Sequence, residues 1–261
     1  MSAFECIQFA CIRTIVNASL AIRRDFIQAE SSYLGGHVAE EDTIFPLVVC
    51  AHNGVFLLNN PSLDDPLTRH LADASRSVVV SIDYRKAPQN KFPGGNLVLA
   101  AAQNPQIRDR LTGIIAVYPI CDLVPSFGEK MASRSDPSVP DFLGSTCPGI
   151  SDLYLGQNAN VELTDVRLSP THFKSRSHLP QNALMVACEH DLLRQEAEGM
   201  AERLATLEGS SKVAAKNGWR AGCIEWYLVE GQPHAFEIFP AKTPEKEAAR
   251  KAAETALYSD E

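Results

Sequence analysis

The stretch ALMVACEHDLLR, residues 183–194, decides the fold. Its first six residues, Ala183 to Cys188, form an apolar run that predicts a buried β-strand, and acidic and basic side chains follow at once. A helical pattern then extends from Asp191 to Leu207. A buried strand that leads through a polar turn into a helix is the repeating unit of an α/β sheet.

The same alternation continues on both sides of this stretch. Four further apolar runs predict buried strands: Pro46 to Ala51, Ser77 to Asp83, Gly113 to Tyr118, and Cys223 to Val229. Helical patterns cover Ser62 to Ser75 and Thr243 to Leu257, the latter with a Thr-Pro-Glu start. We therefore expect an α/β fold with a mostly parallel, doubly wound sheet flanked by helices.

The length of 261 residues and the ordinary apolar content of 45% predict one α/β domain over residues 1–261. Within it, residues 1–45 form a cap-like segment whose apolar residues from Phe4 to Ile22 recur at helical spacing. Residues 124–166 are rich in proline, glycine and serine, which favours a lid inserted into the sheet order.

Charge and cysteine usage limit the location and the partners. A net charge of -8 argues against a general affinity for nucleic acid or anionic lipid. No run is long enough to span a membrane, and Glu5, Gln8 and Arg13 interrupt any signal-peptide core. The seven scattered cysteines, an odd number without a CxxC pair, predict reduced thiols in a cytoplasmic protein.

Two polar motifs follow the first two predicted strands. Ala51-His52-Asn53-Gly54-Val55-Phe56 could direct backbone N–H groups at a developing oxyanion, although such a sequence is more often only a turn. Asp83-Tyr84-Arg85-Lys86-Ala87-Pro88 is, taken alone, best explained as a structural turn in which Asp83 pairs with Arg85.

Two more polar motifs follow the last two strands. Asp191 could hold a histidine in one tautomer, and its simpler explanation is an N-cap of the helix that follows. His234 lies in the loop Gly231-Gln232-Pro233-His234-Ala235-Phe236, where a single histidine is usually structural. An acid after one strand and a histidine after the next nevertheless match the end of the Ser-Asp-His order of α/β hydrolases.

Together, these motifs resemble the hormone-sensitive-lipase-like carboxylesterases of the α/β-hydrolase fold. That family carries His-Gly-Gly-Gly, Asp-Tyr-Arg-Leu-Ala-Pro, Gly-Asp-Ser-Ala-Gly-Gly-Asn, Asp-Pro-Leu-Arg and His-Gly-Phe in this order. The matching residues lie between positions 46 and 240 and are His52 to Phe56, Asp83 to Gln89, Gly94 to Leu97, Asp191 to Arg194, and His234 to Phe236.

The resemblance implies a role for each matching residue. It makes Asp191 the triad acid, His234 the general base, and His52, Asn53, Gly54 and Val55 the oxyanion turn. Asn53 and Val55 replace two glycines of that turn, and a β-branched valine adopts positive φ poorly, so we expect a distorted turn.

The largest departure from the family lies at Lys91-Phe92-Pro93-Gly94-Gly95-Asn96. In the family, several dozen residues separate Phe-Pro from Gly-Gly-Asn, and they include a central strand and the serine. Here Pro93 joins Gly94 directly, only Gly94 and Gly95 remain of the nucleophile elbow, and no Gly-x-Ser-x-Gly occurs. The strands at 77–83 and 113–118 would then close the gap, or an interior edge would stay unpaired.

Three functional hypotheses follow. The first is a carboxylic-ester hydrolase of the serine type, acting on small acyl or aryl esters and impaired by the loss of the serine. The second is an inactive protein that binds a small ester or apolar ligand, loosely like plant gibberellin receptors, which keep the serine and lose the histidine. The third is a nonfunctional gene-model fragment, with faulty splicing and true deletion equally open. No cofactor is expected, because metal and phosphate motifs are absent from the sequence.

Overall fold

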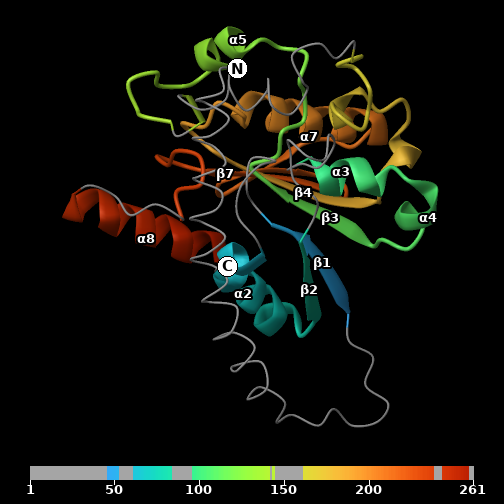
Figure 1. The fold of residues 1–261 in the computed structure, drawn as a ribbon, viewed down its shortest axis with the longest axis horizontal. Helices are drawn as coiled ribbons and strands as arrows, with labels where there is room; N and C mark the ends of the chain where they lie inside the picture. Colours follow the sequence, from blue (N-terminus) through green and yellow to red (C-terminus); the bar gives the residue numbers. More distant parts are fainter. Residues whose placement is uncertain are drawn as a thin grey trace, which may run out of the picture. The chain divides into compact units, whose positions relative to one another are not determined.

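The computed structural model describes residues 46–52, 61–83, 96–141, 143–144, 161–237 and 243–258 (Figure 1). The chain separates into two compact units, Met1–Gly95 and Asn96–Glu261, which are described one at a time. The predicted cap at 1–45 lies outside the described residues, as do residues 142 and 145–160 of the predicted lid at 124–166. The prediction of one domain over the whole chain stays a prediction.

The first unit contains a two-stranded parallel sheet with one helix. Strand β1, Leu47–Ala51, pairs with β2, Val78–Ile82, so that Leu47 lies opposite Val78. The chain returns from one to the other through a 3-10 turn, η1 at Pro61–Asp64, and helix α2, Asp65–Ser75. Proline in its first turn and Arg76 in the left-handed region bound α2, as expected for a helix start and stop. The predicted strands and helix of this region are confirmed.

The second unit contains a five-stranded sheet in the order β3-β4-β7-β6-β5. The three parallel strands are β3, Gly113–Val117, β4, Asn182–Cys188, and β7, Ile224–Val229. The hairpin of β5, Val213–Ala215, and β6, Gly218–Ala221, adds two antiparallel strands at one edge. The helices and 3-10 turns are α3, Leu97–Ala102, α4, Pro105–Arg108, α5, Phe127–Ala132, η2, Pro170–His172, η3, Arg176–His178, α7, Arg194–Glu208, and α8, Pro244–Tyr258.

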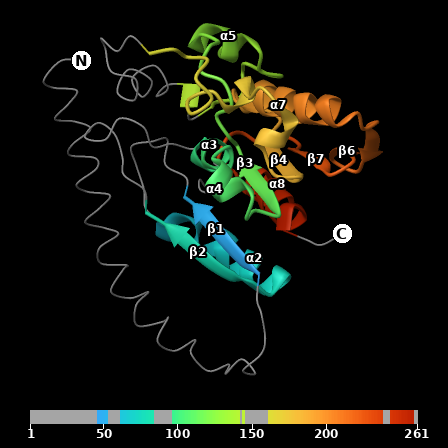
Figure 2. The same cartoon turned by 90° about the vertical axis from the view of Figure 1, so that its right-hand side faces the viewer.

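Both faces of this sheet are covered, as its apolar strands predict. Alternate residues of β4 point to opposite faces. Ala183, Met185 and Ala187 pack with α3 and α7, and Val186 and Cys188 pack on the face where α8 lies. Figure 2 shows α7 and α8 on opposite sides of β4 and β7. The strand prediction for this unit is therefore confirmed, with the carboxyl ends of β3, β4 and β7 at one edge.

Four details differ from the sequence prediction. The hairpin of β5 and β6 was not predicted, because β5 is only three residues long and is exposed along its length. The residues after Asn96 form two short helices, α3 and α4, because Pro105, which cannot donate within a helix, separates them. Helix α7 begins at Arg194 and not at Asp191. The strands at 78–82 and 113–117 belong to different sheets.

Among the described residues, each helix is too short or too polar to cross a lipid bilayer.

Candidate active site

Asp191 and His234 lie together at the carboxyl edge of the five-stranded sheet. Nδ1 of His234 is 2.8 Å from Oδ2 of Asp191, and the Asp191 side chain is fully buried while that of His234 is 12% exposed. A carboxylate at Nδ1 selects the tautomer that leaves Nε2 able to accept a proton. The pair therefore has the geometry of an acid that orients a general base.

Strand register creates this contact between residues that are 43 positions apart. The parallel strands β4 and β7 end together, with Cys188 opposite Val229. Two backbone bonds extend the pairing beyond the strands, from Glu189 N–H to Val229 O at 3.0 Å and from His190 N–H to Gln232 O at 3.0 Å. Because both loops leave the sheet at the same level, Asp191 and His234 meet above the strand ends.

The turn that carries Asp191 uses the other carboxylate oxygen. Oδ1 accepts from the N–H of Leu193 at 2.8 Å, and the Asp191 N–H donates to Cys188 O. Leu193 is the residue that precedes helix α7, and no side chain caps that helix. The simpler explanation of Asp191 as an N-cap is therefore wrong, because Asp191 holds its own turn and presents Oδ2 to the imidazole.

Tyr118 is a third member of the site and follows the end of β3. Its backbone has a φ of 51°, an uncommon conformation for an aromatic residue and a kind of strain that often marks functional sites. Its ring lies edge-on to the imidazole of His234, with 5.4 Å between the ring centroids. Its hydroxyl donates to Oε2 of Glu237 at 3.2 Å, which places a second carboxylate beside the histidine loop.

Carboxylates determine the charge of His234. Burial alone favours the neutral imidazole, but Asp191, Asp141 and Glu237 outweigh burial and raise the pKa of His234 above its ordinary value. Among the described residues, no group forms a hydrogen bond with Nε2 of His234. The site can thus hold a proton on the imidazole, and none of the described hydroxyls or thiols forms a hydrogen bond with it.

Sequence reasoning missed Asp141, Glu237 and Arg134, and it included Tyr118 only as the last residue of a predicted strand. Tyr118 and Glu237 could have been found from the sequence, because one follows a strand that ends at the same edge and the other follows His234 by three residues. Nothing in the local sequence points to Asp141 or Arg134.

The other predicted site residues belong to the first unit. His52 is buried, and its Nε2 lies 3.3 Å from Oδ1 of Asp83. The predicted oxyanion residues Asn53, Gly54 and Val55 lie outside the described residues. So do Arg85 and the elbow remnant at 94–95.

A family model described as alpha/beta hydrolase fold matches the chain over residues 48–93 and 94–236. The chain belongs to the α/β-hydrolase family. The two matched segments of this α/β hydrolase meet between Pro93 and Gly94. At the same junction the motifs Phe-Pro and Gly-Gly-Asn follow each other directly in the sequence.

Esterases are among the curated relatives and the solved structures to which this α/β hydrolase is similar. An arylesterase of Saccharolobus solfataricus is 28% identical over 194 residues, which are 60% of this chain and 61% of the arylesterase. The chain thus spans about three fifths of the length of that relative. A gibberellin receptor of Oryza sativa subsp. japonica is 37% identical over 51 residues, 19% of this chain and 14% of the receptor.

Among solved structures, a hyperthermophilic esterase of the archaeon Pyrobaculum calidifontis has the same fold. It is 26% identical with a TM-score of 0.58, over 84% of this chain and 78% of the esterase. The predicted family and fold class are therefore confirmed.

Proposed function

We propose that this carboxylesterase-type hydrolase retains the acid and base of the catalytic triad but lacks the serine that they would activate. The observation that carries the proposal is the 2.8 Å contact between Asp191 and His234 in a chain without a Gly-x-Ser-x-Gly motif. The division of the family match at Pro93 and Gly94 supports a missing nucleophile segment at that junction.

The expected consequence is a strongly impaired esterase for small acyl or aryl esters. In this mechanism the histidine takes the proton of a serine hydroxyl, and the serine oxygen attacks the ester carbonyl. In a serine protease, the loss of the nucleophile lowers turnover by a factor on the order of 10⁶. His234 would then contribute no more than an exposed imidazole does to ester hydrolysis.

Hydrolysis of p-nitrophenyl acetate tests the proposal when it is combined with a fluorophosphonate probe that labels activated serines. His172→Ala is the matched control for His234→Ala, because His172 belongs to another histidine–aspartate pair, with 3.2 Å between its Nε2 and Oδ1 of Asp122. We expect slow hydrolysis without a burst, no label, and the same small effect of both substitutions. A stoichiometric label that His234→Ala abolishes and His172→Ala spares would refute the proposal.

A second candidate is a catalytically inactive protein that binds a small ester or apolar ligand. The partial similarity to a gibberellin receptor favours this candidate, since a receptor of this family needs a pocket but no turnover. A cooperative thermal melt that small acids or esters shift upward would support ligand binding. A melt without cooperativity would instead favour a gene-model fragment, and sequencing the transcript across the codons of Pro93 and Gly94 would decide between a splicing error and a true deletion.

We also propose a cytoplasmic location. The described cysteines Cys50, Cys121, Cys188 and Cys223 are all free thiols, which suits a reducing compartment. Fractionation of cells that produce the chain tests the location.

A further inference from the structure

One segment of the second unit contacts the turn of Asp191 at several points. This segment, residues 130–141, begins in α5 and continues through the loop that follows, and we call it the clamp segment. It lies within the region that the sequence analysis predicted as a lid. Its polar side chains reach the backbone and side chains of residues 189–196, so the clamp segment and the turn of Asp191 support each other.

Arg134 forms the first of these contacts. Its guanidinium is 2% exposed; Nε donates to the carbonyl of His190 at 3.0 Å, and Nη2 donates to the carbonyl of Val139. The neighbouring Ser135 hydroxyl donates to the carbonyl of Glu189 at 2.8 Å. Arg134 and Ser135 therefore fix both peptide carbonyls that precede Asp191.

Asp141 forms the second contact. Its carboxylate is fully buried, and Oδ2 accepts from the N–H of Leu192 at 3.0 Å while Oδ1 accepts from the N–H of Leu143 at 2.8 Å. Asp191 accepts from the next N–H, that of Leu193. Two buried carboxylates thus bind successive N–H groups of one turn, and Arg134 Nε lies 3.8 Å from Oδ2 of Asp141.

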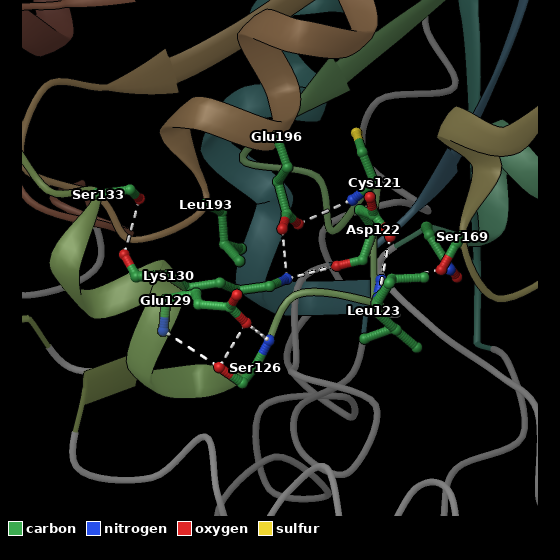
Figure 3. Close-up of polar contacts among 12 residues, drawn as sticks. Cys121, Asp122, Leu123, Ser126, Glu129, Lys130, Ser133, Ser169, Leu193 and Glu196 are labelled. Atoms are coloured by element: carbon green, nitrogen blue, oxygen red, sulfur yellow. Dashed lines mark hydrogen bonds and ion pairs between the residues drawn. The ribbon is translucent and has the colours of Figure 1, made fainter. Parts of the chain in front are cut away.

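A third contact joins α5 to the start of α7. Figure 3 shows Lys130 reaching from α5 to the carboxylate of Glu196, to which it donates. Lys130 Nζ also donates to the carbonyl of Asp122 at 2.5 Å, and the other Glu196 oxygen accepts from the N–H of Cys121 at 2.9 Å. This ion pair joins Lys130, the first residue of the clamp segment, to Glu196. Glu196 lies three residues beyond Leu193, where the turn of Asp191 ends.

We propose that Asp141 and Arg134 are positioning residues that set the orientation of Asp191 and, through it, of His234. The inference rests on the proposed function, because it gives the Asp191–His234 pair a purpose. Arg134 fixes the carbonyl side of the turn and Asp141 fixes its N–H side, so the carboxylate of Asp191 has one direction in which to point. Asp141 also acts on His234 directly, as a second negative charge.

The charged and titratable groups around His234 come from four elements. Asp191 follows β4, Asp141 belongs to the clamp segment, Glu237 lies in the loop of His234 itself, and Tyr118 follows β3. The three carboxylates all raise the pKa of His234, with Asp191 first among them. Removing the charge of Asp141 should therefore lower the pKa of His234, by less than removing that of Asp191.

An NMR titration of the His234 imidazole tests this inference, with His234→Gln to identify the resonance among seven histidines. The variants are Asp191→Asn and Asp141→Asn, with Asp136→Asn as the matched control. Asp136 lies in the same segment, but its carboxylate accepts from Ser138 and is not among those that act on His234. We expect the pKa of His234 to fall most in Asp191→Asn, less in Asp141→Asn, and not in Asp136→Asn.

The unsubstituted protein provides a second measurement in case Asp141→Asn does not fold. The carboxyl carbon of Asp141 should show an inflection in its ¹³C shift at the pH where His234 titrates, as that of Asp191 should. Equal behaviour of Asp141→Asn and Asp136→Asn, or a flat Asp141 carbon, would overturn the inference and leave the proposed function intact. If Asp191→Asn also left the titration unchanged, the proposed acid–base pair itself would be refuted.

Discussion

Asp191 orients the imidazole of His234, because Oδ2 of Asp191 lies 2.8 Å from Nδ1 of the ring. The contact depends on the parallel register of β4 and β7, in which Cys188 lies opposite Val229. An acid three residues beyond one strand therefore meets a base five residues beyond the other. The proposed acid and base thus both belong to the second unit.

The charge of His234 predicts how stability depends on pH. Its pKa is raised in the folded protein, so the fold binds this proton more tightly than the unfolded chain does. The resulting stabilisation is complete below the unfolded pKa of about 6.5 and is lost as the pH rises through the folded pKa. The stability difference between the native protein and His234→Gln, measured by urea unfolding, should shrink with rising pH. A difference that grows with pH would contradict the assignment.

The raised pKa of Glu196 predicts a second dependence of stability on pH, with the same sign as that of His234. Burial is the largest influence and raises the pKa of Glu196 to about 7, although Lys130 opposes it. The protonated Glu196 therefore contributes its full stabilisation below pH 4.5. This contribution, roughly 3 kcal/mol at most, is lost as the pH rises from 4.5 through about 7. Glu196→Gln should flatten this part of the profile. Glu198→Gln, two residues further along α7 and paired with Arg194, should leave the profile unchanged.

Replacing Gly218 with a residue that has a Cβ atom should destabilise the fold. Its φ is 155°, and a Cβ atom there would lie 2.0 Å from the carbonyl oxygen of Trp226 on the paired strand β7. We expect Gly218→Ala to cost roughly 2–4 kcal/mol of unfolding free energy, because backbone atoms must separate. Gly199→Ala in α7 meets no atom within 4 Å and should instead stabilise by about 0.5–1 kcal/mol. Urea unfolding of both variants gives the comparison.

Removing the hydroxyl of Tyr118 should lower the stability of the fold modestly. Tyr118 is buried, and its hydroxyl is hydrogen-bonded to Glu237 at 3.2 Å. Tyr118→Phe should lower the unfolding free energy by about 1–2 kcal/mol, since the bond involves a charged acceptor. Tyr227→Phe is the control, because its hydroxyl accepts from the neutral Asn217 side chain, and the expected loss is about 1 kcal/mol. An unchanged midpoint for Tyr118→Phe would show that this bond does not stabilise the fold.

Much of the fold was predictable because it is encoded locally. The five longest strands are mostly apolar, and α2 and α8 have regular helical patterns. The hairpin of β5 and β6 was missed, since its strands are short and polar turns dominate the stretch. The break between α3 and α4 follows from Pro105, which removes a donor from the helix.

The sequence by itself determined the order of the strands along the chain, the identity of the candidate acid and base, and the absence of a serine elbow motif. Each of these is a property of residue types within a few positions of one another. Only the tertiary structure decided that Asp141 and Arg134 reach the turn of Asp191 and that the hydroxyl of Tyr118 contacts Glu237. Tyr118 and Glu237 are 119 positions apart, and their contact depends on strand pairing and packing that leave no local pattern in the sequence.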